Sequence, residues 1–130
     1  MNGRRFALGN RVRRRSDFVR AYTGGARTQG RYMAVFLVPN GLPAARLGVA
    51  ATRKLGSAVK RNRAKRLARE IFRRHPIAES FDVIIVPRRE ILDAPFSNLE
   101  ADYLSAVERN RSQRKQRSHS NYNPRRRPRV

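Results

Sequence analysis

The stretch 54–70, KLGSAVKRNRAKRLARE, has the periodicity of a helix that can be buried on one side only. Helical steps of about 100° per residue place Leu67, Ala68 and Ile71 within about 60° of Ala64, with Phe72 at the margin of the stripe. Gly56-Ser57 supplies a stop and an N-cap, and His75-Pro76 closes the pattern. The pattern therefore predicts a long helix whose apolar stripe packs against the rest of the chain. The stripe consists of Ala64, Leu67, Ala68 and Ile71.

The opposite side of this predicted helix is cationic. Arg66, Arg69 and Arg73 are three, four or seven positions apart, and like charges three or four positions apart destabilise a helix by roughly 0.2–0.5 kcal/mol per pair. Glu70 is the only nearby acid that reduces this repulsion. Lys60 and Arg61 lie in the first turn, where the helix dipole disfavours cations. A solvated charged surface is the alternative, but the electrostatic cost favours an anionic partner. The side opposite the stripe carries Asn62, Arg66, Arg69 and Arg73, with Arg63 and Lys65 beside them.

The charge of the whole chain identifies nucleic acid as the most plausible anion. The 130 residues include 31 Lys and Arg against 9 Asp and Glu, a formal net charge of +22. So large a charge opposes compaction unless a polyanion neutralises it. A membrane surface is the weaker alternative, because the chain has no Trp anchor and its basic helix needs the apolar stripe for packing.

The remaining patterns predict one α+β domain over 16–110. Ser16 is expected to cap a helix over 16–23 that ends at Gly24-Gly25. Apolar runs predict strands over 32–38, 46–52 and 81–87, the last buried on both faces, and a final helix follows over 96–109. The short 39–45 loop predicts that the first two strands are antiparallel neighbours, whereas the strand–helix–strand unit over 46–87 requires parallel strands if they are adjacent. We expect a basic arm over 1–15 and a disordered basic tail over 111–130.

The sequence favours binding over catalysis by protein groups. The nine acids are scattered, and of the two histidines, His75 ends a helix and His119 lies in the predicted tail. The chain has no Cys, no Walker-type loop and no apolar run of transmembrane length. We therefore expect no catalytic residue, no metal site and no cofactor in the protein, and a cytoplasmic location without a secretory signal.

The order of residues across 46–70, RLGVAATRKLGSAVKRNRAKRLARE, resembles the bacterial ribonuclease P protein family. That family has an Arg-x-Gly strand, a basic pair before a glycine, Ala-Val, and Arg-Asn-Arg followed by Lys-Arg. The 16–25 stretch, SDFVRAYTGG, resembles the first helix of the family, and the similarity spans about 10–110. The matching residues here are Arg46 and Gly48, Arg53-Lys54 and Gly56, Ala58-Val59, Arg61-Asn62-Arg63 and Lys65-Arg66.

The resemblance implies a fold of order α-β-β-β-α-β-α, a mixed four-stranded sheet with an extra strand near 26–31 and a left-handed β-α-β crossover. It also implies an enzyme subunit, which pairs one-to-one with a catalytic RNA that uses Mg²⁺ and removes the 5′ leader of precursor tRNA. In that family the basic helix faces the RNA subunit, and the cleft between the first helix and the sheet receives the leader.

Two sets of residues are therefore candidates for contact with RNA. Stacking aromatics combined with cations hold single strands without reading their sequence. The alternatives are that the aromatics are core residues and that Arg88-Arg89 is ordinary surface charge. The predicted set for the RNA subunit is Lys60, Arg61, Asn62, Arg63, Lys65, Arg66, Arg69 and Arg73. The predicted leader set is Phe18, Tyr22, Phe36, Arg53, Lys54, Arg88 and Arg89.

A structural RNA-binding protein, such as a ribosomal protein, is the alternative function, because it would share the size, charge and tail. The ordered 46–70 pattern together with the aromatic pair Phe18 and Tyr22 favours the ribonuclease P protein.

Overall fold

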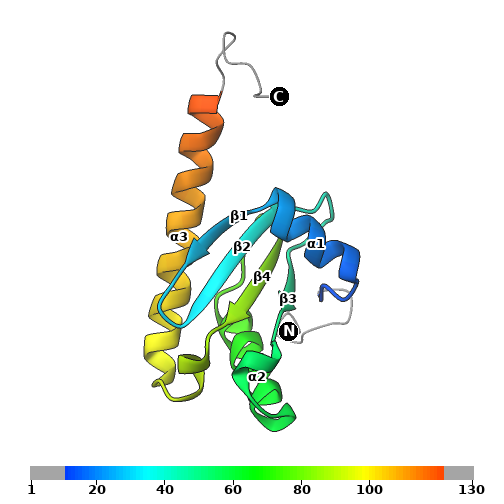
Figure 1. Ribbon diagram of the computed structural model, residues 1–130. Coiled ribbons are helices and arrows are strands. Elements are labelled where there is room, and N and C mark those ends of the chain that lie inside the picture. Colours follow the sequence, from blue (N-terminus) through cyan, green and yellow to red (C-terminus); the bar gives the residue numbers. More distant parts are fainter. Residues whose placement is uncertain (1–10, 122–130) are drawn as a thin grey trace.

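The computed structural model describes the backbone of residues 11–121 and the side chains of residues 11–113 (Figure 1). Three helices surround one mixed sheet, and two short 3-10 turns flank the basic helix and the last strand. The helices are α1 (Arg15–Gly24), α2 (Ala58–Arg74) and α3 (Phe96–Asn121), and the turns are η3 (Arg53–Leu55) and η4 (Arg89–Leu92). The strands are β1 (Ala26–Gln29), β2 (Met33–Pro39), β3 (Arg46–Val49) and β4 (Phe81–Pro87).

The strand order is β1-β2-β4-β3, which corrects the prediction that β2 and β3 are neighbours. Seven antiparallel residue pairs join β2 to β4, and β3 pairs with the other side of β4 in parallel. β4 takes the central place because its apolar run, with Val83, Ile84 and Ile85 fully buried, needs cover on both faces. The loop over 40–45 is long enough to cross the width of one strand, so sequence proximity does not decide the pairing.

The connection from β3 through α2 to β4 is left-handed, as the family resemblance implies. α1 lies on the near face of the sheet in Figure 1 and α2 lies behind it, with β3 and β4 parallel. Nearly all such connections in proteins are right-handed. The predicted α+β fold, including the extra strand β1, is therefore confirmed.

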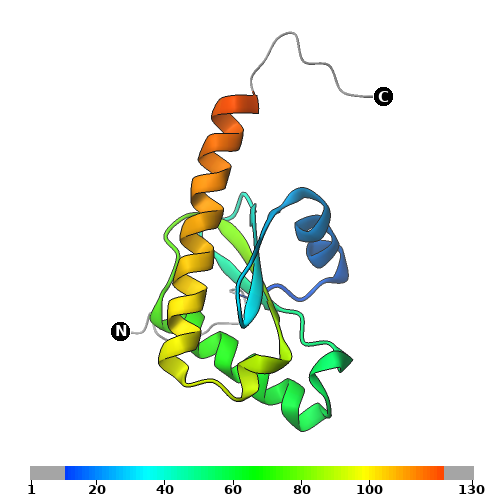
Figure 2. The same ribbon diagram turned by 60° about the vertical axis from the view of Figure 1, so that its left-hand side comes forward.

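The two sheet faces have separate cores. Alternate residues of β2, including Met33, Val35 and Leu37, pack with α2 and α3. Their neighbours Phe36 and Val38 pack with α1 instead. Figure 2 shows α3 along the face opposite α1, with its last turns projecting beyond the sheet. The face covered by α1 is the one that carries the predicted aromatic residues.

Three element boundaries differ from the predictions. α1 begins at Arg15 after an Arg14 that makes no side-chain cap bond, so Ser16 is not the N-cap. The backbone explains this, because the N–H groups of Asp17 and Phe18 both donate to the Arg14 carbonyl. β3 ends at Val49 rather than at 52, because the chain turns into η3, where the Leu55 N–H donates to the Thr52 carbonyl.

The third difference is the end of α3. Residues 111–121, predicted as part of a disordered tail, continue the helix to Asn121. Their composition cannot build a core, but adding a residue to an existing helix is far easier than starting one. The stretch 111–121 has no Pro or Gly to stop it. The predicted arm over 1–10 and the tail over 122–130 lie outside the described residues.

Candidate nucleic-acid interface

The start of α2 is held as predicted. The Ser57 hydroxyl accepts a hydrogen bond from the Lys60 N–H at 3.3 Å, and the predicted stripe is buried at Ala64, Ala68 and Ile71. Leu67 is only half-buried, whereas Phe72, predicted at the margin, is buried. The helix is thus fixed against the sheet by its apolar side, which leaves its cations available around the rest of its circumference.

The predicted cationic residues of α2 do not form one face but divide into three groups. Lys60 and Arg63 line a hollow that η4 closes from the other side. Asn62 and Arg66 are exposed. Lys65 and Arg69 line a second hollow of about 260 Å³ on the β3 side, which they share with Arg11 and Arg13 of the segment before α1.

Two of the predicted RNA-binding residues, Arg61 and Arg73, make hydrogen bonds to other groups of the protein. The Arg61 guanidinium donates to the Gly56 carbonyl at 2.8 Å, bracing the entry to the helix. Arg73 and Arg74 both donate to the Glu70 carboxylate. Hydrogen bonds from Arg73 and then Arg74 hold the pKa of Glu70 below its ordinary value. The guanidinium groups of Arg61 and Arg73 are therefore already hydrogen-bonded within the protein. They are poorer candidates for RNA contact than those of Arg63 and Arg66.

The β3 side of α2 concentrates positive charge. Partial burial, followed by the charges of Arg11 and Arg66, lowers the pKa of Arg69 from its ordinary value. Two cations of α2 and one of the N-terminal segment thus lie close enough to repel one another. Neutralisation of such a cluster by phosphate would relieve the repulsion.

The three predicted aromatics gather between α1 and the sheet, but their exposures differ. The ring centroids of Phe18 and Tyr22 are 6.4 Å apart, and those of Tyr22 and Phe36 are 5.0 Å apart. Tyr22 is 43% exposed, whereas Phe36 is only 8% exposed. Tyr22 therefore offers the ring on which a base can stack, and Phe36 mainly supports it from beneath.

A broad hollow lies on the same sheet face, beyond this aromatic cluster. It has a volume of about 720 Å³, and Lys54, Arg88 and Arg89 of the predicted leader set line it together. Arg53 is exposed on η3 but does not line it. The structure thus brings three of the four predicted leader cations together, whereas none of the three predicted aromatics lines their hollow.

Arg27 connects the two parts and was not predicted. Its guanidinium lies 6.0 Å from the centroid of the Phe36 ring, and the residue also lines the broad hollow. Its place on β1 opposite Phe36 puts it on the face covered by α1. The signal that could have found it is the alternation of the 26–29 strand, once that strand is paired with β2.

Comparisons with known proteins identify the family of this chain. A family model described as Ribonuclease P matches residues 6–110, which is most of the chain. The chain belongs to the ribonuclease P protein family. The chain is similar to the ribonuclease P protein component of Thermotoga maritima, with 40% identity over 88 residues that cover 66% of this chain and 75% of the relative. The component from Desulfovibrio desulfuricans is 35% identical over 105 residues, which cover 76% of this chain and 81% of the relative.

Solved structures of ribonuclease P proteins show the same fold. The Thermotoga maritima RNase P protein matches with a TM-score of 0.69 and 35% identity, covering 76% of this chain and 96% of that one. The Staphylococcus aureus RNase P protein, solved at 2.0 Å, also has a TM-score of 0.69, with 29% identity and coverage of 76% and 93%.

The Arg-x-Gly part of the ribonuclease P protein pattern is explained by packing. Arg46 binds the buried carboxylate of Asp82 on the neighbouring strand through two hydrogen bonds. A Cβ on Gly48 would lie 2.9 Å from the Val12 Cβ and 3.0 Å from the Phe18 Cζ. Because Gly48 lacks that atom, α1 can approach β3 and seat Phe18 against the sheet. Gly48 therefore helps to position the candidate interface, and Arg46 fixes the strand pair beside it.

Two features are absent from the described part of the chain. No helix within it is both long enough and apolar enough to cross a membrane. Among residues 11–113, whose side chains are described, no group of three or more His, Asp or Glu side chains is placed to hold a metal ion.

Proposed function

We propose that this chain is the protein subunit of ribonuclease P, an endoribonuclease that matures the 5′ end of tRNA. Membership of the ribonuclease P protein family is the observation that carries the proposal. The RNA subunit performs the cleavage, and Mg²⁺ in its active site supplies the metal chemistry of phosphodiester hydrolysis. The protein alone should cleave nothing. The predicted cytoplasmic location and the one-to-one pairing with the RNA stay predictions.

In this proposal α2 binds the RNA subunit through backbone phosphates. Arg63 and Arg66 are exposed cations without a carboxylate partner among the described residues, so they can pair with phosphate at little cost. Lys65 and Arg69 add a second contact toward β3, where the repulsion with Arg11 favours an anion. The arrangement supports an RNA that runs along α2 rather than a point contact.

The face covered by α1 binds the single-stranded leader in the same proposal. Tyr22 provides an exposed ring for stacking, and the cations around the broad hollow provide phosphate contacts. Stacking tolerates every base, which suits a leader whose sequence varies between precursor tRNAs. Arg27 joins the two parts of this surface.

Reconstitution tests the proposal directly. The full chain is mixed with a bacterial ribonuclease P RNA and a precursor tRNA at a low Mg²⁺ concentration, and 5′ cleavage is followed on a gel. We expect the mixture to cleave at the mature 5′ end and the protein alone to leave the substrate intact. Tight binding to the RNA without any stimulation of cleavage would instead indicate a structural RNA-binding protein.

A further inference from the structure

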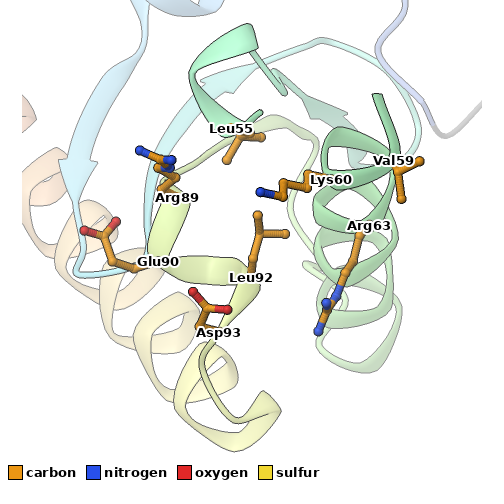
Figure 3. Close-up of a pocket in the computed structure, with 8 residues that line it drawn as sticks. All are labelled: Leu55, Val59, Lys60, Arg63, Arg89, Glu90, Leu92 and Asp93. Carbon is orange, nitrogen blue, oxygen red and sulfur yellow. The ribbon is translucent and has the colours of Figure 1, made fainter. Parts of the chain in front are cut away.

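A hollow of about 480 Å³ between the start of α2 and η4 is lined by apolar, cationic and acidic side chains (Figure 3). Its apolar lining comes from Leu55, Val59 and Leu92. Leu55 is 1% exposed and forms a fixed base, whereas Val59 is 77% exposed in the first turn of a helix that is otherwise cationic. An apolar side chain presented to solvent in this way is unexplained by the packing of α2.

Four of the five charged side chains that line this hollow have no partner among the described residues, although both signs are present. Lys60, Arg63 and Arg89 line it with Asp93. None of these four side chains makes a hydrogen bond or an ion pair with another residue of the described part of the chain. Glu90, the remaining acid of the lining, has Arg88 at 3.8 Å. Lys60, Arg63 and Arg89 therefore line the same hollow as Asp93 without forming an ion pair with it.

Figure 3 shows how these groups lie. Lys60 extends from α2 toward the space between Leu55 and Leu92, and Asp93 stands beside Leu92 on the opposite wall. Arg89 enters from the side of η4, where the hollow shares Leu55 and Arg89 with the broad hollow on the sheet. Residues that the sequence assigned to two separate RNA surfaces thus border one cavity.

We propose that this hollow binds one unpaired nucleotide of RNA whose base carries an exocyclic amine. A nucleotide combines the chemistry of the three walls, because its base has an apolar face, its phosphate is anionic, and its Watson–Crick edge bears hydrogen-bond groups. The volume lies within the range of small-ligand sites, about 300–1,000 Å³. The inference rests on the proposed function, since it requires that RNA reaches the start of α2.

Asp93 gives the hollow its selectivity. A carboxylate accepts hydrogen bonds from the amine of cytosine or adenine, as carboxylates do from cytosine N4 in DNA recognition. Uracil has the shape of cytosine but presents a carbonyl oxygen at that position, which a carboxylate repels. The cations provide the affinity by contact with phosphate, and the Asp93 carboxylate provides the choice of base.

Pentaribonucleotides of cytidine and of uridine test this assignment, because they match in length and charge. Binding to the full chain is measured by fluorescence anisotropy at pH 7.5 and fixed salt. We expect the cytidine pentamer to bind about ten-fold more tightly, the discrimination typical of one good base contact. D93N should bring the two affinities within about two-fold of each other.

E108Q is the matched control, because it removes the same charge from an exposed residue of α3 that does not line the hollow. It should keep the full preference for cytidine. A second variant, V59D, places an acid in the first helical turn, where it favours the helix. It should retain the thermal stability of the chain while weakening both pentamers, because the new carboxylate opposes the phosphate.

The outcomes separate this inference from the proposed function. Equal binding of the two pentamers by the unaltered chain, or an unchanged preference in D93N, would overturn the nucleotide site and leave the ribonuclease P assignment standing. Failure of both pentamers to bind, together with failure of the reconstitution, would overturn both.

Discussion

Arg46 on β3 donates two hydrogen bonds to Asp82 on β4, from Nε to Oδ1 at 2.8 Å and from Nη2 to Oδ2 at 2.7 Å. The two residues are direct partners in the parallel register, and the Asp82 side chain is fully buried. Arg20 and Asn40 reach the same carboxylate from α1 and from the loop after β2. One buried acid thus joins four segments of the chain.

Replacing Arg46 should destabilise the fold strongly. Arg46→Ala leaves the buried Asp82 charge without its main partner, and we expect a loss of about 3–5 kcal/mol in the free energy of unfolding, measured by urea denaturation. Arg20→Ala is the control, because the Arg20 side chain is 44% exposed, and it should cost no more than about 1 kcal/mol. Equal losses in the two variants would contradict a central role for Arg46.

The same carboxylate should make stability depend on pH in acid. Burial alone would raise the pKa of Asp82, but hydrogen bonds from Arg46 and Asn40 and the charges of Arg46 and Arg20 lower it below its ordinary value. The stabilisation is therefore complete above the unfolded pKa of about 3.9 and is lost as the pH falls below it through the folded value. Unfolding by urea from pH 7 to pH 3 measures this loss.

Asp82→Asn supplies the comparison, since it lacks the titrating group. The stability difference between the unaltered chain and D82N should be constant at neutral pH and shrink below about pH 4. A difference that stays constant down to pH 3 would show that Asp82 does not titrate in this window.

Charge reversal on α2 should weaken assembly with the RNA subunit. The exposed pair Arg63 and Arg66 is the better target than Arg61, whose guanidinium braces Gly56. R63E/R66E should reduce affinity for ribonuclease P RNA at least ten-fold, since two phosphate contacts become repulsive. Filter binding at fixed salt measures this. Reversing the exposed Arg31 and Arg27 changes the net charge equally and should affect RNA-subunit affinity far less.

Tyr22 should distinguish precursor from mature tRNA. Stacking of a base on an aromatic ring contributes about 1–3 kcal/mol, so Tyr22→Ala should reduce the preference for the leader-bearing precursor about ten-fold. Val19→Ala is the control, because Val19 is similarly exposed on α1 but lies outside the aromatic cluster. Phe18→Ala is less suited, since Phe18 also packs against the core below α1. An equal loss of affinity for both tRNAs would rule out the leader role of Tyr22.

The residues after Gln113 should contribute to the salt dependence of RNA binding. Truncation after Gln113 removes seven Lys and Arg residues and no acid, while keeping the Arg111–Glu79 ion pair at 2.7 Å. Each phosphate contact contributes about −0.7 to −0.9 to the slope of log affinity against log salt. If these residues bind RNA, the slope of the truncated chain is flatter by at least one such increment. An unchanged slope would exclude them from the interface.

Local patterns predicted the parts of this structure that local interactions decide. The Ser57 cap and the apolar stripe at Ala64, Ala68 and Ile71 follow from helical period alone. The strand order does not, because β2 and β3 each pair with the later, more apolar β4 instead of with each other, through contacts distant in sequence.

The site shows the same division. The sequence showed which residues are cationic, but it could not show which of them lie together. Arg63 and Arg89 line one hollow only because η4 folds beside α2. Nor could the pattern reveal that Phe36 is nearly covered while Tyr22 is exposed, since both are aromatics at plausible interface positions.

The central place of β4 has a consequence for the order of folding during synthesis. Among the strands of residues 11–121, β3 pairs only with β4, so 46–49 must wait until 81–87 has emerged before it can join the sheet. Arg46 and Asp82 meet at the same moment. A nascent chain that stops before residue 81 therefore contains its whole cationic helix with only β1 and β2 able to pair, and the four-stranded sheet on which α2 packs forms only once β4 has emerged.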